Sequence, residues 1–503
     1  MRVAVKRSLV AAMVIAVGAV SIAVTTGEPV ADASWWSPNE PRTFEARHDY
    51  ADDAGVVTTL NTNGPTPVAG HPFFSSFSAN GRACVSCHQP ADGMSLSVDS
   101  IRKRWRETGG KDPIFAAVDG SDCPSLPQDK ESSHSLLLKR GLFRIARPWP
   151  PRDLDGKRIE PEFTIEVVRD PTRCNRDPQY GLTSAQPMVS VYRRPRPTAN
   201  LKYVTSVGFP FEPKQGLPLP TDAETGQLIS GNLLADGRMP TVRAQIRDAM
   251  RVHLGVTGAV PASTVDSIEA FLNGVYSAQS VHRVGGLLTD GGAEGGPEVL
   301  RDAREGDLQY GGAPIWKEFL PWANAAKDAS LTAEQRAFRE SVARGAEIFA
   351  KRTFLIDNSA GITNMGFGNP VRNSCAFCHN MQRTGMDVAP GQVDLGTTNA
   401  PTANSSPELP LFKLTCREGA RPHPHLGRVV YTQDPGFALT TGKCIDIGKI
   451  TIQQMRGLAA RPPYFSNGSA QTIRDIVDYY ERRYRIGLTE QEKQDLTNLM
   501  SVL

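Results

Sequence analysis

Two pentads of the pattern Cys-x-x-Cys-His constrain this chain more than any other feature of its sequence. The first, CVSCH, runs from Cys84 to His88, and the second, CAFCH, runs from Cys375 to His379. The chain has eight cysteines in all. A plain disulfide framework does not explain why a histidine directly follows both closely spaced pairs. The four pentad cysteines are therefore interpreted separately from the other four.

The pentad is typical of covalent attachment of a c-type haem. Two thiols add to the two vinyl groups of the macrocycle, and the adjacent imidazole reaches the iron as its proximal ligand. A zinc site would need two further ligands at similar spacing, and a redox pair needs no histidine there. We therefore predict two covalently bound haem c groups, held by Cys84, Cys87, Cys375 and Cys378 and ligated by His88 and His379.

The other four cysteines fall as one pair after each pentad. Cys123 and Cys174 follow the first, and Cys416 and Cys444 follow the second. We interpret them as two structural disulfides, one in each half of the chain. Free buried thiols are the alternative.

The first 33 residues have the features of an export signal. A basic "MRVAVKR" precedes the apolar "SLVAAMVIAVGAVSIAV", and "ADA" at 31–33 offers a cleavage site of small residues. The mature chain is expected to start at Ser34 and to be periplasmic or otherwise exported. The alternative is an uncleaved anchor, because the apolar run approaches the ~20 residues that span a bilayer.

Length and composition indicate more than one domain. The chain has 503 residues, 40% of them hydrophobic, which is too long for a single core. The glycine-rich stretch at 284–298 suggests a boundary, with an N-terminal haem domain over 34–290 that carries a proline-rich insertion, and a C-terminal haem domain over 291–503. With 56 basic against 53 acidic residues and no basic run, nothing argues for nucleic acid.

The hydrophobic periodicity predicts a mainly α fold made of two cytochrome c-like haem domains with long irregular loops. Helical patterns cover 94–109, 239–255, 262–279, 331–352 and, as two helices, 469–503. Thr332 is a candidate N-cap, as is Ser263 or Thr264. Alternating residues around 158–170 suggest a short β-hairpin insertion, within irregular backbone that wraps around the first haem.

At these motifs the chain resembles the bacterial di-haem cytochrome c peroxidase and MauG superfamily. The likeness is strongest over the last 200 residues, at "RGAEIFAKR", "CAFCH", "MRGLAARPPYFSNGS" and "IRDIVDYYERR". In the first half it rests on "CVSCH", "PTANL" and "LLADGRMPTVRAQ". The resemblance implies a peroxidase that takes electrons from a small donor protein, a c-type cytochrome or a cupredoxin, and implies one calcium ion.

Three departures from the family pattern bear on function. Ala235 stands where the family places a tryptophan between the haems, so a bridge would come from elsewhere, for instance Trp105 or Trp322. The acidic residue that assists peroxide cleavage would fall near Gly255 and is absent there. His253 is the nearest group that can act as acid and base or as a displaceable ligand.

The third departure concerns the sixth ligand of the C-terminal haem, where Tyr480 aligns with a methionine in peroxidases and a tyrosine in MauG. The alternative is a core tyrosine on an apolar helical stripe. Candidate catalytic residues are thus His253, Gln245 and Arg456, and Tyr480 is a candidate iron ligand. Two other functions stay open: a non-catalytic di-haem electron carrier, and a MauG-like oxidase of a protein or organic substrate.

Overall fold

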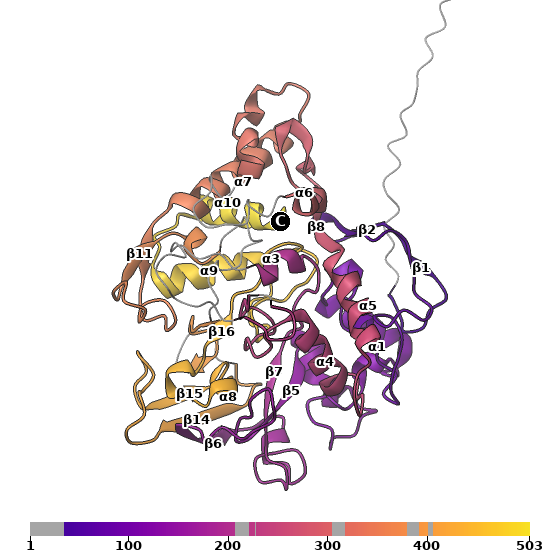
Figure 1. Ribbon diagram of the computed structural model, residues 1–503. Coiled ribbons are helices and arrows are strands. Elements are labelled where there is room, and N and C mark those ends of the chain that lie inside the picture. Colours follow the sequence, from indigo (N-terminus) through magenta and orange to yellow (C-terminus); the bar gives the residue numbers. More distant parts are fainter. Residues whose placement is uncertain (1–34, 207–220, 227, 304–316, 380–391, 401–405) are drawn as a thin grey trace, which may run out of the picture. The chain divides into compact units, whose positions relative to one another are not determined.

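The structure is a computed structural model that describes residues 35–206, 221–226, 228–303, 317–379, 392–400 and 406–503 (Figure 1). The predicted export signal over 1–33 lies outside the described residues. No helix of the described residues is long and apolar enough to cross a membrane. The described residues all belong to one compact unit. The boundary expected near residue 290 stays a prediction.

The helices begin where polar caps and apolar periodicity coincide. Ser97, Thr332, Thr472 and Thr489 each accept a hydrogen bond from a backbone N–H of the first turn, as N-cap side chains do. The helices are α1 (Val98–Thr108), α2 (Ser135–Arg140), α3 (Leu201–Thr205), α4 (Val242–Val252), α5 (Ala262–Asn273), α6 (Pro297–Asp302), α7 (Ala333–Lys351), α8 (Ala438–Thr441), α9 (Ile473–Tyr484) and α10 (Glu490–Ser501).

The helix predicted over 262–279 is wrong in its last third. α5 is preceded by Pro261 instead of Ser263 or Thr264 as its cap, and it ends at Asn273. The next segment, Val275–His282, is the strand β8, which pairs with β3 (Gly55–Asn61). Backbone pairing with a distant strand overrides the local helical pattern.

Six small sheets lie between the helices in the described chain. Two have four strands, in the orders β2-β3-β8-β9 and β13-β15-β14-β6, and the two-stranded sheets are β1-β4, β5-β7, β10-β11 and β12-β16. The remaining strands are β1 (Thr43–Phe44), β2 (Arg47–Ala51), β4 (Thr66–Pro67), β5 (Phe143–Pro148), β6 (Phe163–Arg169), β7 (Met188–Arg193), β9 (Gly286–Leu287), β10 (Phe354–Ile356), β11 (Val371–Asn373), β12 (Gln392–Val393), β13 (Asn399–Ala400), β14 (Leu411–Cys416), β15 (Val429–Thr432) and β16 (Ile450–Thr451).

The strand predicted around 158–170 is present as β6, but it is not part of a hairpin. It pairs antiparallel with β14, with Phe163 opposite Cys416. The N-terminal insertion thus joins a sheet built mainly by the second half. Buried side chains from both halves, including Phe163, Phe412 and Leu414, pack on one another beneath this sheet.

In the second half, α7 packs closely against α10. A Cβ atom at Gly345 would lie 2.2 Å from the carbonyl oxygen of Asp495, so only glycine allows this approach. The Asp495 carboxylate also accepts hydrogen bonds from Ser341 and Arg344. This packing places Leu496 and Met500 of α10 at the edge of an apolar pocket.

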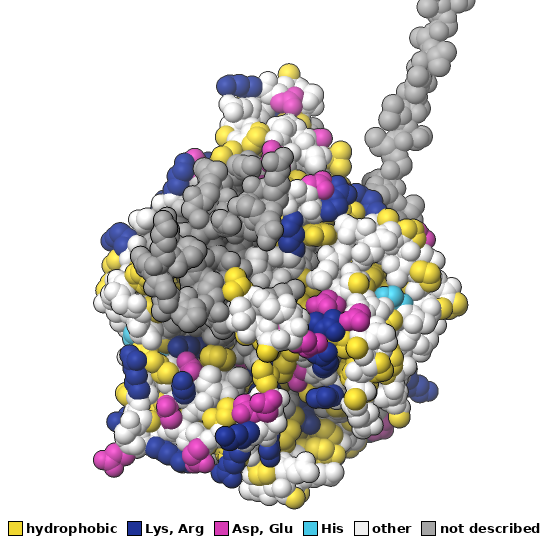
Figure 2. Space-filling model, viewed as in Figure 1, with side chains coloured by type: hydrophobic (Ala, Val, Ile, Leu, Met, Phe, Trp, Pro, Cys, Tyr) yellow, Lys and Arg dark blue, Asp and Glu magenta, His cyan; other side chains and the backbone are white. Residues whose placement is uncertain are grey.

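On the face shown in Figure 2, charged side chains of both signs are interspersed over the described residues.

The two predicted disulfides are confirmed, as Cys123–Cys174 and Cys416–Cys444. They span 51 and 28 residues of chain. By loop-closure entropy, each should stabilise the fold by about 4 kcal/mol. We expect the double variant Cys123→Ser/Cys174→Ser to unfold at a clearly lower guanidinium concentration than the wild type. An unchanged midpoint in the denaturation curve would contradict this role.

Candidate functional site

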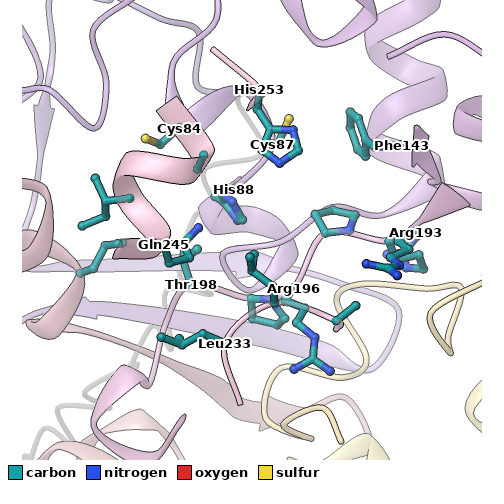
Figure 3. A pocket seen from close by; sticks show the side chains of 18 of the residues that line it. Cys84, Cys87, His88, Phe143, Arg193, Arg196, Thr198, Leu233, Gln245 and His253 are labelled. Atoms are coloured by element: carbon teal, nitrogen blue, oxygen red, sulfur yellow. The ribbon is translucent and has the colours of Figure 1, made fainter. Parts of the chain in front are cut away.

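The first pentad opens into a largely apolar pocket, called pocket 1, with about 1400 Å³ of empty space (Figure 3). Cys84, Cys87 and His88 all line it. Cys84 begins a turn of 3₁₀-helix over Cys84–Ser86, which brings the two thiols and the imidazole to the same cavity. Neither thiol forms a disulfide, unlike the four cysteines outside the pentads. Burial raises the pKa of the Cys84 thiol to about 12.

A backbone carbonyl group six residues further along the chain orients the His88 ring. Its Nδ1 lies 3.2 Å from the carbonyl oxygen of Met94, so Nδ1 carries the hydrogen and donates it. This tautomer leaves the lone pair on Nε2, which is the usual arrangement for a histidine that binds a metal. Burial lowers the pKa of His88 to about 4, so the ring is neutral and able to donate its lone pair. The donor set therefore fits a haem iron.

A second histidine, His253, lies in the same pocket (Figure 3). It is the C-cap of α4 and is near enough to His88 for the two rings to interact electrostatically. Its Nδ1 is 2.5 Å from Oδ2 of Asp119. Asp119 is 2% exposed and also pairs with the fully buried Arg82. Nε2 of His253 has no partner within the described residues.

Asp119 stays ionised although it is buried. Burial by itself raises its pKa, but the charge of Arg82 and the hydrogen bond from His253 outweigh this and lower it. Arg82 is in turn held by the carbonyl oxygens of Pro113 and Ile114, at 2.7 and 2.6 Å. Arg82, Asp119 and His253 are thus linked by consecutive contacts. These contacts fix the His253 imidazole and place the negative charge of Asp119 behind it.

The other two predicted catalytic residues lie in different parts of the fold. Gln245 of α4 lines pocket 1 together with His253. Arg456 lines neither pocket 1 nor the pocket of the second pentad. It pairs instead with Glu318 at 2.8 Å. Ala235 lines pocket 1, whereas Trp105 and Trp322 line neither this pocket nor the pocket of the second pentad described below. A bridge through either tryptophan stays a prediction.

The second pentad opens into another apolar pocket, called pocket 2, with about 1420 Å³ of empty space. Cys375, Cys378 and His379 line it, and so does Tyr480 of α9. The hydroxyl of Tyr480 lies 3.5 Å from Nε2 of His379. Burial raises the pKa of the Tyr480 phenol well above its ordinary value.

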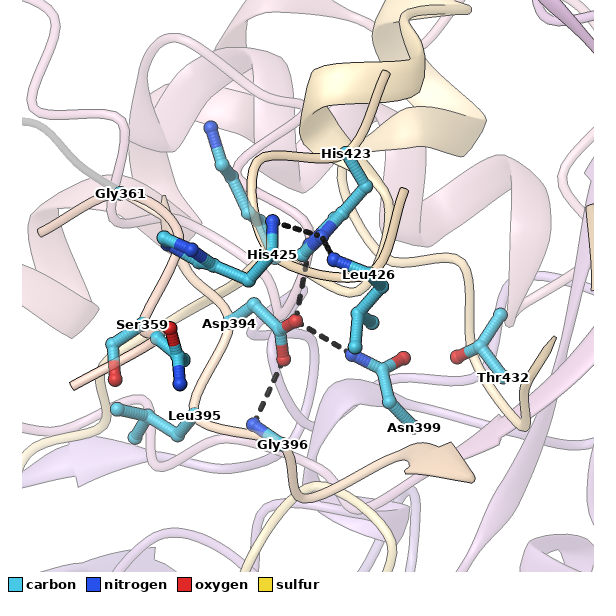
Figure 4. A network of polar contacts seen from close by, with 12 residues as sticks. Ser359, Gly361, Asp394, Leu395, Gly396, Asn399, His423, His425, Leu426 and Thr432 are labelled. Carbon is cyan, nitrogen blue, oxygen red and sulfur yellow. Dashed lines mark hydrogen bonds and ion pairs between the residues drawn. The ribbon is translucent and has the colours of Figure 1, made fainter. Parts of the chain in front are cut away.

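Tyr479, the neighbour of Tyr480, faces elsewhere. Its hydroxyl donates to the carbonyl oxygen of Leu395 at 2.6 Å, and it does not line pocket 2. Two residues of the pocket lining, Leu395 and Thr397, lie in a segment that Asp394 holds by hydrogen bonds (Figure 4). This carboxylate accepts from Gly396 N and Asn399 Nδ2 at 2.8 and 2.6 Å, and His423 Nε2 lies 3.2 Å away.

No three His, Cys, Asp or Glu side chains of the described residues gather closely enough to hold a metal ion by themselves. The calcium ion implied by the resemblance stays a prediction. Sequence reasoning missed Arg82 and Asp119, which lie far from His253 along the chain. Asp119 is 134 residues from His253 along the chain, so no local signal could have paired the two.

Known proteins show only weak structural likenesses to this chain. The chain matches no protein family model, and no curated protein matches it. Hydrazine synthase of Kuenenia stuttgartiensis is 13% identical, over 62% of this chain and 73% of that one, with a TM-score of 0.28. A MauG-like protein associated with microbial copper homeostasis is 18% identical, over 61% and 80%, with a TM-score of 0.26. Likenesses this weak carry no argument about function.

Proposed function

We propose that this chain is an exported di-haem c-type oxidoreductase that reduces hydrogen peroxide. Two electrons come from a small donor protein, a c-type cytochrome or a cupredoxin, and with two protons they convert one peroxide to two waters. The observation that carries the proposal is the pair of oriented histidines in pocket 1. The two disulfides are compatible with an exported protein.

The two histidines of pocket 1 have complementary roles in this proposal. Haem would supply the redox centre for peroxide reduction, and the lone pair on His88 Nε2 would hold its iron. His253 Nε2 takes the first proton from peroxide and returns it to the leaving oxygen. Asp119 is a positioning residue, because it holds Nδ1 of His253 and stabilises the imidazolium that forms after proton transfer.

The same geometry supports a rival, the non-catalytic electron carrier. If His253 Nε2 binds the iron permanently, peroxide has no access. The spin states of the two ferric haems separate these functions. We expect electron paramagnetic resonance to show one high-spin and one low-spin centre in the active form. Two low-spin centres in the fully ferric protein, with the remaining ferric centre still low-spin after addition of one electron per protein, would favour the carrier.

We expect His253→Ala to lower kcat/KM for peroxide by about 10²- to 10⁴-fold, because general acid–base catalysis contributes on this scale. The measurement is steady-state turnover with a reduced donor protein, at equal haem content. His48→Ala is the matched control, because His48 is also part-buried but lies on β2, outside both pockets. Equal turnover in the two variants would refute the assignment of His253.

The third function, a MauG-like oxidase, is favoured by one observation, the proximity of Tyr480 to His379. An anionic oxygen ligand favours higher oxidation states of iron. Tyr480 ligation is therefore part of the proposal that can be tested independently of peroxide turnover.

A further inference from the structure

Pockets 1 and 2 share one wall. Three residues line both of them: Arg194, Gln453 and Gln454. Gln454 is locked in place, because its Oε1 accepts from Asn200 and its Nε2 donates to the carbonyl oxygen of Ala199, both at 2.9 Å. Arg194 is thus the one charged side chain of the described residues that faces both cavities.

Arg194 is 7% exposed, and its guanidinium contacts only neutral acceptors. It donates to the carbonyl oxygens of Leu96, Arg461 and Arg140. It forms no ion pair within the described residues. Asp92 attracts it electrostatically, but burial together with repulsion by Arg461 outweighs this attraction and lowers the pKa of Arg194 to about 9.

Each pocket is lined by one further arginine that forms no ion pair within the described residues. Arg196 lines pocket 1 and Arg461 lines pocket 2. In both, Nε is a buried donor with no acceptor. Their other donors contact backbone carbonyl oxygens, such as that of Asn232 for Arg196 and that of Gln454 for Arg461.

The neighbouring Arg193 shows that the fold pairs buried arginines with acids elsewhere. Arg193 contacts Asp434 at 2.6 Å and Asp236 at 2.7 Å, and Arg238 contacts the other oxygen of Asp236 at 2.8 Å. A buried charge without a counter-ion is strongly unfavourable. Three unpaired guanidiniums around one shared wall therefore indicate anions that come with the ligands of the two pockets.

We propose that Arg194, Arg196 and Arg461 form a cradle for carboxylates carried by the two pocket ligands. Arg196 serves pocket 1, Arg461 serves pocket 2, and Arg194 serves both. This inference rests on the proposed function, under which the carboxylates are the propionates of the two haems. Arginine suits the task because its planar fork binds carboxylates with two parallel hydrogen bonds.

The cradle has a consequence for the redox potentials. Reduction adds one electron to a centre, so a nearby positive charge stabilises the reduced form and raises the midpoint potential. Removing Arg196 should therefore lower only the midpoint of pocket 1, and removing Arg461 only that of pocket 2. Removing Arg194 should lower both.

The test is a spectroelectrochemical titration of the purified holoprotein and of Arg194→Met, Arg196→Met and Arg461→Met. A variant without the first pentad's thiols assigns the two midpoints to their pockets. Arg144→Met is the matched control, because Arg144 is also buried with an unpartnered Nε but lines neither pocket. Arg194→Lys keeps the charge and should keep both midpoints nearer to the wild type.

The pattern of shifts decides the outcome. Two lowered midpoints in Arg194→Met, and one in each of the other two variants, support the cradle. If the variants contain both haems and their midpoints do not differ from those of Arg144→Met, the cradle is refuted. If Arg194→Met does not fold, the pocket-specific shifts of Arg196→Met and Arg461→Met decide. A wild-type protein without haem would instead refute the proposed function.

Discussion

Replacing Cys84 and Cys87 together by serine is expected to reduce the covalently bound haem from two per chain to one. The thioether bonds need both thiols, and a serine hydroxyl does not form them. The structure places the two thiols and His88 around one cavity and leaves the thiols out of disulfides. Acid-acetone extraction followed by a haem assay of the protein residue measures the effect. The corresponding change at Cys375 and Cys378 should remove the other haem.

The control for this loss is Cys416→Ser/Cys444→Ser, which also removes two cysteines but breaks a structural disulfide. It should be less stable and still carry both haems. If the Cys84→Ser/Cys87→Ser protein retains two extraction-resistant haems, the first pentad does not attach one. If the disulfide variant loses haem equally, the loss reflects folding and not attachment.

Tyr480→Met is expected to raise the midpoint potential of the pocket 2 haem by a large fraction of the ~0.8 V range that axial ligands command. A thioether favours ferrous iron, whereas a phenolate is a hard donor that favours ferric iron. The Tyr480 hydroxyl lies 3.5 Å from Nε2 of His379 and lines the same pocket, so the proposal assigns both residues to one iron. A redox titration monitored in the visible spectrum measures the shift.

Tyr479→Phe is the matched control for Tyr480→Met. It removes a hydroxyl from the preceding residue of α9, which does not line pocket 2 and donates to the carbonyl oxygen of Leu395. This variant should leave the midpoint and the visible spectrum unchanged. An unchanged midpoint in Tyr480→Met would return Tyr480 to a packing role, and the donor-dependent peroxidase would then be favoured over MauG-like oxidation.

Features that depend on near neighbours in the chain were predicted from the sequence. The pentads and the helices α1, α7, α9 and α10 rest on residues a few positions apart. The two disulfides join cysteines 51 and 28 residues apart, and they were predicted because one pair of cysteines remains after each pentad. Thr332, for example, caps α7 through the backbone N–H of Gln335, three residues on. Such contacts lie within one helical turn, so a local sequence pattern is enough to predict them.

The tertiary structure alone decided what surrounds each pentad. Val275–His282 became a strand because β3 pairs with it, and β6 found its partner in β14 about half the chain away. Asp119 meets His253 from 134 residues earlier, and Arg194 faces both pockets. These contacts join segments that no short-range pattern relates, because a side chain's partners across a folded core depend on how all the elements pack together.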